Sequence, residues 1–126
     1  MSEADFKEWI LLANHDADTA DLLIRQRGHA DIIIYHIHQA IEKLLKALLI
    51  KAGGTFEKTH FLDKLLAKII IIYPELSKCE ENILAINLYL PKLRYPYGDV
   101  IEFEEAEETY KKFIDIKRAL FKLLGE

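Results

Sequence analysis

The chain has few of the features that cross-link a fold or anchor it in a membrane. Its single cysteine, Cys79, cannot form an internal disulfide bond and has no second thiol nearby for a zinc site. No apolar run approaches the roughly 18 residues that a membrane-spanning helix requires; Ile69–Tyr73 is among the longest. The start, Met1–Asp5, lacks the basic and apolar segments of a signal peptide. We therefore expect a globular cytoplasmic protein that is stabilised by packing, with no contact to a membrane.

The sequence also lacks an excess of positive charge. Its formal net charge is −4 at pH 7, whereas a protein that coats nucleic acid needs many basic side chains facing phosphates. The charges are unevenly distributed, since residues 1–24 carry six acids and the single base Lys7, and residues 40–70 hold six lysines and three acids. If an anionic ligand binds, we expect it to bind to the middle of the chain.

Common catalytic and metal-binding motifs are missing as well. There is no Gly-rich phosphate loop, nucleophile elbow or paired-carboxylate motif. His36 and His38 are two residues apart and so about 200° apart on a helix, which prevents them from chelating one metal ion. His15 with Asp18 supplies two ligands, too few for a dedicated site. The sequence predicts neither a metal nor a cofactor.

What the sequence does contain is strong helical periodicity. Apolar residues recur at spacings of three and four in three long segments, as they do on one face of an amphipathic helix. The first segment ends at Gly28, the second runs from about His29 to Ala52, and the last spans about Glu102 to Leu124. The second is the most hydrophobic, so we expect it to be central. The stripes are Phe6, Ile10, Ala13, Ala17, Ala20 and Ile24; Ile33, Ile37, Ala40, Leu44 and Leu48; and Phe103, Ala106, Tyr110, Phe113, Leu120 and Leu124.

Capping residues place the helix ends. Ser2 with Asp5 is a plausible cap for the first helix, and Thr59 can cap a third helix that runs from His60 to Ile72. Two isoleucine-rich runs, Ile32–Tyr35 and Ile69–Ile72, carry more apolar surface than one core face needs. We expect a partner subunit to cover the excess, which favours a homodimer.

A fourth helix is expected after Pro74, which closes the third. Ser77 with Glu80 forms a capping box at its start, and Pro91 should kink or end it just before Leu93. Five helices with short connections predict an all-α fold, an antiparallel four-helix up-and-down bundle with a short extra helix. At this length the chain should form one domain over residues 1–126.

A polar stripe lies on the second helix. Gln39, Lys43 and Lys46 fall at positions i, i+4 and i+7, and Glu42 is placed for an i,i+4 ion pair with Lys46. A solvated face is one interpretation, and a ligand-binding stripe on the most apolar helix is the other. Three further residues have the same two interpretations, because His60, Arg94 and Tyr95 either take part in capping and stacking or bind a ligand.

Three blocks together resemble the HEPN domain family. The blocks are His38–Leu49, Lys58-Thr59-His60-Phe61-Leu62 and Arg94-Tyr95-Pro96, and they match that family's Gln-Ala-x-Glu-Lys-x-x-Lys-Ala-Leu helix, its Thr-His-x-Leu turn and its Arg-Tyr-Pro segment in order. The resemblance covers residues 5–124. It implies a homodimer whose partner is a minimal nucleotidyltransferase in a toxin–antitoxin-like pair. It also implies binding of a nucleotide or RNA, for which the candidate residues are Gln39, Lys43, Lys46, Arg94 and Tyr95.

The same resemblance raises the question of catalysis. Many HEPN proteins are metal-independent ribonucleases in which an arginine is followed, after four to six residues, by a histidine. Arg94 fits the arginine, but Asp99, Val100 and Ile101 occupy the positions of the histidine, and no histidine follows His60. A binding or regulatory module is therefore our main hypothesis. The alternatives are a divergent ribonuclease that uses Arg94 with His60, and a structural helper without a ligand.

Overall fold

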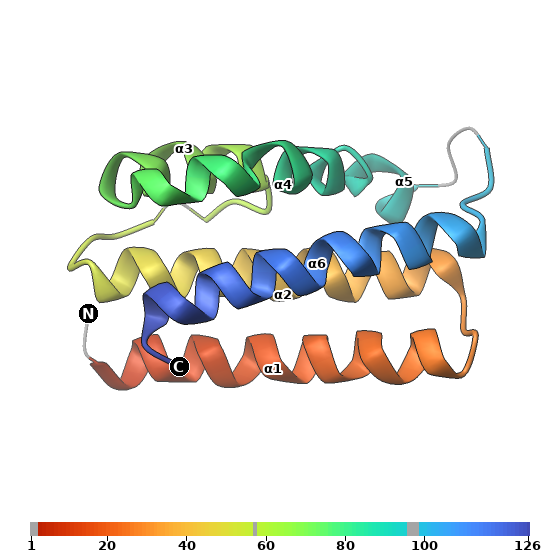
Figure 1. Cartoon of the computed structure of the whole chain (residues 1–126), viewed down its shortest axis with the longest axis horizontal. Coiled ribbons are helices and arrows are strands. Elements are labelled where there is room, and N and C mark those ends of the chain that lie inside the picture. Colours follow the sequence, from red (N-terminus) through yellow and green to blue (C-terminus); the bar gives the residue numbers. More distant parts are fainter. Residues whose placement is uncertain (1–2, 57, 96–98) are drawn as a thin grey trace.

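The computed structural model describes residues 3–56, 58–95 and 99–126 (Figure 1). These residues form the helices α1 (Glu3–Arg25), α2 (Ala30–Lys51), α3 (Leu62–Ile72), α4 (Glu80–Asn87), α5 (Leu90–Arg94) and α6 (Phe103–Leu124), and a 3-10 helix, η1 (Pro74–Cys79), precedes α4. No strand is present in these three ranges, and the expected all-α class is confirmed. Ser2 and Pro96, which belong to the expected first cap and to the third block, lie outside the described residues.

Helix α2 is the centre of the molecule, as its composition predicts. It packs most extensively against α1 and α6, and α3 and α5 also contact it. Figure 1 shows α1 along one side of α2, the layer of α3 and α4 along the other, and α6 crossing in front. The residues of its predicted apolar stripe, Ile33, Ile37, Ala40, Leu44 and Leu48, are all buried, because neighbours cover the helix from several sides.

The expected fourth helix is divided into η1, α4 and α5. Helix α4 has Cys79 at its N-cap and no side-chain cap bond, so the predicted capping box of Ser77 with Glu80 is wrong. Pro91 lies in the first turn of α5, where a backbone N–H group would have no partner within the helix. The helix is therefore interrupted before this proline, between Asn87 and Leu90, and not after it. The four-helix up-and-down detail of the expected bundle is therefore not confirmed.

The start of α3 differs from the prediction in a way that positions the candidate site. The Thr59 hydroxyl accepts a hydrogen bond from the Phe61 N–H group (3.1 Å), ahead of the helix. Helix α3 begins only at Leu62, whose N–H group donates to Oδ1 of Asn87 (2.8 Å) at the end of α4. The end of α4 thus caps α3. As a result, His60 belongs to the loop between α2 and α3 instead of to a helix.

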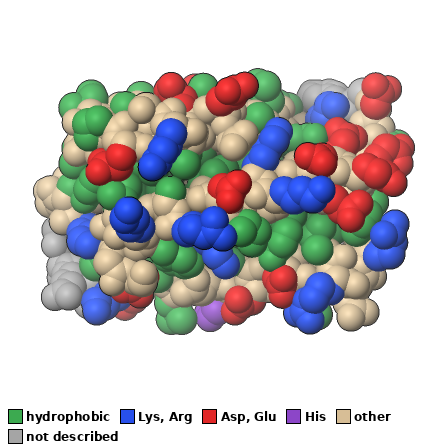
Figure 2. Space-filling model, in the orientation of Figure 1, with side chains coloured by type: hydrophobic (Ala, Val, Ile, Leu, Met, Phe, Trp, Pro, Cys, Tyr) green, Lys and Arg blue, Asp and Glu red, His purple; other side chains and the backbone are tan. Residues whose placement is uncertain are grey.

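Helix α6 confirms the predicted segment, and its acidic side chains come early and its basic ones late. Glu102 is its N-cap and forms a capping box with Glu105, and Gly125 ends it in the left-handed conformation with φ 79°. Acidic side chains gather at the end of the molecule where α6 begins (Figure 2). This arrangement suits the helix dipole.

Some large apolar side chains remain on the outside. Ile32 and Tyr35 on α2 and Ile71 and Ile72 on α3 are exposed, with 81% of Ile71 accessible to solvent. Both isoleucine-rich runs therefore place apolar surface outside the core of this chain. None of the described helices combines the length and the apolar composition that crossing a bilayer would require.

Candidate functional site

The carboxylate of Glu42 is the centre of a polar cluster beside α2. Its Oε2 atom accepts a hydrogen bond from Nζ of Lys46 (3.0 Å), and its Oε1 atom lies 3.2 Å from Nδ1 of His60. Nε2 of Gln39 donates to the same Oε1 atom at 3.4 Å. We call Gln39, Glu42, Lys46 and His60 the Glu42 cluster. The i,i+4 ion pair expected from the sequence is confirmed.

Lys46 lies inside the protein and not on a solvated face. Its ammonium group is 5.3 Å from the ring centroid of Trp9 and 5.2 Å from that of Phe56, and the two rings pack edge to face. Aromatic faces attract a cation, and the buried Glu42 carboxylate supplies the opposite charge. A ligand could contact Lys46 only by displacing these partners.

Lys43 is also paired, but with α1. Its ammonium group donates to Oδ2 of Asp16, whose Oδ1 atom lies 2.8 Å from Nδ1 of His36. Sequence reasoning missed Asp16 and the role of His36. A signal was present, because Asp16 lies three residues after Ala13 and four before Ala20 and so interrupts the apolar stripe of α1. The charge of Lys43 is therefore balanced within the chain.

His60 is partly exposed beside Glu42. Its side chain is 54% exposed, and Nδ1 lies 3.2 and 3.3 Å from the two carboxylate oxygens of Glu42. A carboxylate accepts hydrogen bonds, so this geometry places a hydrogen on Nδ1. Nε2 has no hydrogen-bond partner in residues 3–56, 58–95 and 99–126. Glu42 therefore orients the imidazole and leaves its outer nitrogen available to a ligand.

Arg94 ends α5 on the same side of α2. Its side chain is exposed, and no carboxylate in the described part of the chain forms an ion pair with it. Arg94 and His60 both lower the pKa of His38, so both side chains lie near this buried ring. Tyr95, the next residue, is exposed as well. His60 and Arg94, which are 34 positions apart in the sequence, thus both lie near His38.

His38 is the residue of this region that sequence reasoning did not select. Its side chain is fully buried, and neither ring nitrogen has a hydrogen-bond partner among the described residues. Burial lowers its pKa from 6.5 to about 4; Glu42 opposes this shift, and the charges of His60 and Arg94 add to it. A signal was present here too, because His38 falls at helical spacing between the buried residues Ile34 and Ile41.

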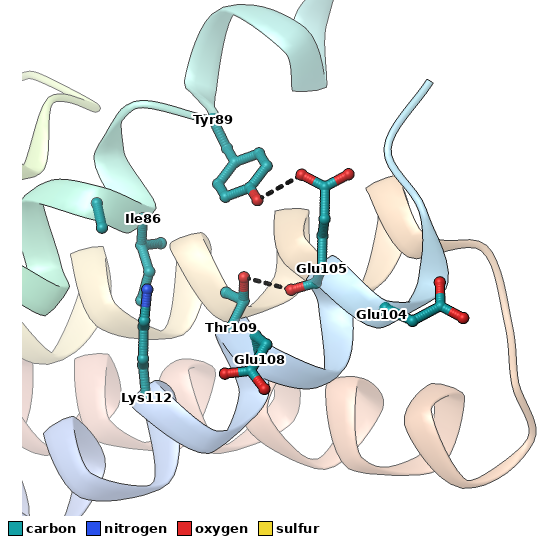
Figure 3. Close-up of a pocket in the computed structure, with 8 residues that line it drawn as sticks. Ile86, Tyr89, Glu104, Glu105, Glu108, Thr109 and Lys112 are labelled. Carbon is teal, nitrogen blue, oxygen red and sulfur yellow. Dashed lines mark hydrogen bonds between the residues drawn. The ribbon is translucent and has the colours of Figure 1, made fainter. Parts of the chain in front are cut away.

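A separate hollow lies between α4 and α6 (Figure 3). It has a volume of about 250 Å³ and contains none of the residues selected from the sequence. The Tyr89 hydroxyl donates to Oε1 of Glu105 (2.8 Å), and the Thr109 hydroxyl donates to the backbone oxygen of Glu105 (2.7 Å). Burial, followed by the Glu105 carboxylate, raises the pKa of Tyr89. The first bond joins Tyr89, between α4 and α5, to α6, and the second lies within α6, so these polar groups are explained without a ligand.

Within the described ranges, no three His, Cys, Asp or Glu side chains are placed to hold one metal ion. The family model of the HEPN domain matches residues 6–123 of the chain. Comparisons with curated proteins and with solved structures gave no match.

Proposed function

Since the chain belongs to the HEPN domain family, we propose that it binds a phosphate group of a nucleotide or of RNA at His60 and Arg94, beside the Glu42 cluster. The observation that carries this proposal is that His60 and Arg94, both exposed, lie near the same buried ring of His38, with Arg94 unpaired in the described part of the chain. Such groups are the usual ligands of phosphate oxygens.

The charges around the site favour an anion. The Glu42 carboxylate would repel a phosphate group if it were unbalanced, but Lys46 neutralises it from inside the protein. The guanidinium group of Arg94 can donate two parallel hydrogen bonds to phosphate oxygens. His60, held by Glu42 through Nδ1, can donate from Nε2 when it is protonated. Gln39 belongs to the Glu42 cluster, whereas Lys43 is paired with Asp16 of α1. Tyr95, which is exposed, can stack on a base.

Titration calorimetry with inorganic phosphate, nucleoside monophosphates and a short single-stranded RNA tests this proposal. Replacement of Arg94 by Ala should weaken binding of all three at least about tenfold, which corresponds to the loss of about 1.4 kcal/mol. His60→Ala should weaken it as well. Arg118→Ala is the matched control, because Arg118 is an exposed arginine on α6 whose nearest carboxylate is Asp115, at 3.4 Å. Equal affinities of the parent and the Arg94→Ala variant would refute the site.

A specific observation favours a second function, that of a metal-independent ribonuclease. An imidazole oriented by a carboxylate is the arrangement of a general base, and His60 with Glu42 has this geometry. Arg94 would then stabilise the negative charge on the phosphate. The histidine expected four to six residues after Arg94 is missing, so we place this function second.

We also propose a homodimer that acts with a minimal nucleotidyltransferase in a toxin–antitoxin-like pair. The exposed apolar residues Ile32 and Tyr35 support the dimer, and family membership supports the partner. Co-expression with a nucleotidyltransferase encoded beside this gene, followed by purification through a tag on one protein, tests the pair. Recovery of the tagged protein alone would argue against the pair. Absence of any ligand or partner would leave the structural-helper hypothesis.

A further inference from the structure

The imidazole of His38 is an anomaly within the core. Neither of its two ring nitrogens has a hydrogen-bond partner within the described ranges. All other buried side-chain nitrogen and oxygen atoms of the described residues have one. Buried polar groups in folded proteins nearly always have such a partner, since an unpaired one destabilises the fold. A leucine or phenylalanine here would avoid that cost. The histidine therefore needs an explanation other than the packing of α2.

No neighbour in the described chain uses the ring. The side chain of Asn87 interacts with the ring and raises its pKa, but neither ring nitrogen forms a hydrogen bond with a described residue. The Asn87 oxygen accepts from the Leu62 N–H group, and its amide donates to Asp63 at 3.4 Å. The Asn87 oxygen and one of its N–H groups are thus directed at the start of α3. Glu42 is committed to Lys46, His60 and Gln39. The donor and acceptor capacity of His38 is left for a molecule that the chain does not itself contain.

The charge state of the ring restricts what that molecule can be. A pKa of about 4 keeps His38 uncharged at neutral pH, mainly because the ring is buried. A neutral imidazole offers one N–H donor and one bare nitrogen acceptor. It cannot balance the charge of a phosphate group, whereas it matches an uncharged group that both donates and accepts. The base edges and the ribose hydroxyl groups of a nucleoside have this chemistry.

We propose that His38 binds the uncharged nucleoside part of a nucleotide, while His60 and Arg94 hold its phosphate group. This inference rests on the proposed function and names the residue that would distinguish a nucleotide from a bare anion. Because the ring is covered in the unliganded chain, binding displaces whatever covers it.

Two substitutions of His38 test this role by calorimetry. His38→Phe removes the donor and the acceptor but keeps an aromatic ring, and His38→Gln keeps an uncharged donor and acceptor. The ligands are inorganic phosphate, ribose 5-phosphate and the four nucleoside monophosphates. For His38→Phe we expect unchanged affinity for inorganic phosphate and at least about tenfold weaker binding of the best monophosphate. His38→Gln should stay within about threefold of the parent.

The pattern of ligands identifies the group that His38 contacts. A loss confined to the monophosphates assigns the contact to the base, and a loss shared by ribose 5-phosphate assigns it to the sugar. The melting temperature of His38→Phe should rise, because two unpaired polar atoms leave the core. Weaker binding by a more stable protein cannot result from unfolding. His38→Leu carries the same expectations if the phenylalanine ring does not fit.

Three results would overturn the inference, and they separate it from the proposed function. Unchanged binding of every monophosphate by His38→Phe and His38→Leu would show that the ring has no contact with the ligand. An equal loss of inorganic phosphate would show a general effect on the site. If the parent binds phosphate through Arg94 but binds nucleotides no better than phosphate, this inference alone fails. If it binds neither, the proposed function fails with it.

Discussion

The ammonium group of Lys46 lies 3.0 Å from Oε2 of Glu42, and both side chains are more than nine-tenths buried. Removal of one member of such a pair leaves the other charge buried without compensation. We therefore expect Glu42→Ala to lower the free energy of unfolding by about 3 to 5 kcal/mol. Urea denaturation followed by circular dichroism measures this change.

An exposed pair on α6 provides the control for this experiment. Arg118 lies 3.4 Å from Asp115, and both side chains are more than two-thirds exposed. Solvent screens such pairs, so Arg118→Ala should change the free energy of unfolding by less than about 1 kcal/mol. If Glu42→Ala and Arg118→Ala have the same small effect, the buried pair does not stabilise the fold.

The second prediction concerns acid stability and His38. Its pKa is about 4 in the folded chain and 6.5 in the ordinary, solvated state. Between these values the unfolded chain binds a proton that the folded chain does not, so stability falls as the pH is lowered from about 6.5 to about 4. This shift corresponds to about 3 kcal/mol. Urea midpoints at several pH values should decline less steeply for His38→Phe than for the parent, and parallel curves would contradict the assignment.

The long helices could be predicted from the sequence because their periodicity extends over many turns. The stripes of α1, α2 and α6 depend on local spacing, and a shift of one or two residues at an end does not change them. The region from Pro74 to Arg94 is different. Its segments are short, and the start of α3 is set by Asn87, 25 positions after Leu62. Contacts over such distances have no signature in local sequence.

In the candidate site, too, local pairs could be predicted from the sequence and contacts between distant segments could not. The spacing of Glu42 and Lys46 indicates their ion pair. The burial of Lys46 could not be read from that spacing, because it depends on Trp9 and Phe56, which come from two other segments. His38 illustrates the same limit, since its lack of partners follows from where Asn87 directs its amide.

The third prediction is that the protein is a homodimer in solution. Ile32 and Tyr35 are exposed and lie on one face of α2 with Gln39, so a second copy can bury this apolar surface next to the Glu42 cluster. Sedimentation at micromolar concentration should give twice the mass of the 14.7 kDa chain. Ile32→Lys should produce monomers.

Ile71→Lys is the matched control for the dimer, because Ile71 is an equally apolar but more exposed residue on α3. It should leave the dimer intact. A monomeric parent would contradict the prediction. Dissociation by Ile71→Lys alone would move the interface to α3.

The last prediction is that the purified protein does not cleave RNA. Cleavage without a metal needs one group that accepts a proton from the 2′-hydroxyl and another that donates a proton to the leaving oxygen. His60 can serve as one of them. His38 cannot act as a general acid at neutral pH, because its pKa of about 4 leaves the ring as a neutral imidazole, and Asp99 provides a carboxylate where the family's ribonucleases have a histidine. Structured and single-stranded RNA would be incubated with the parent, His60→Ala and Arg94→Ala in EDTA, which suppresses contaminating metal-dependent nucleases. We expect intact RNA in all three reactions. Cleavage by the parent that both substitutions abolish would establish the ribonuclease hypothesis and show that one oriented imidazole with Arg94 is sufficient.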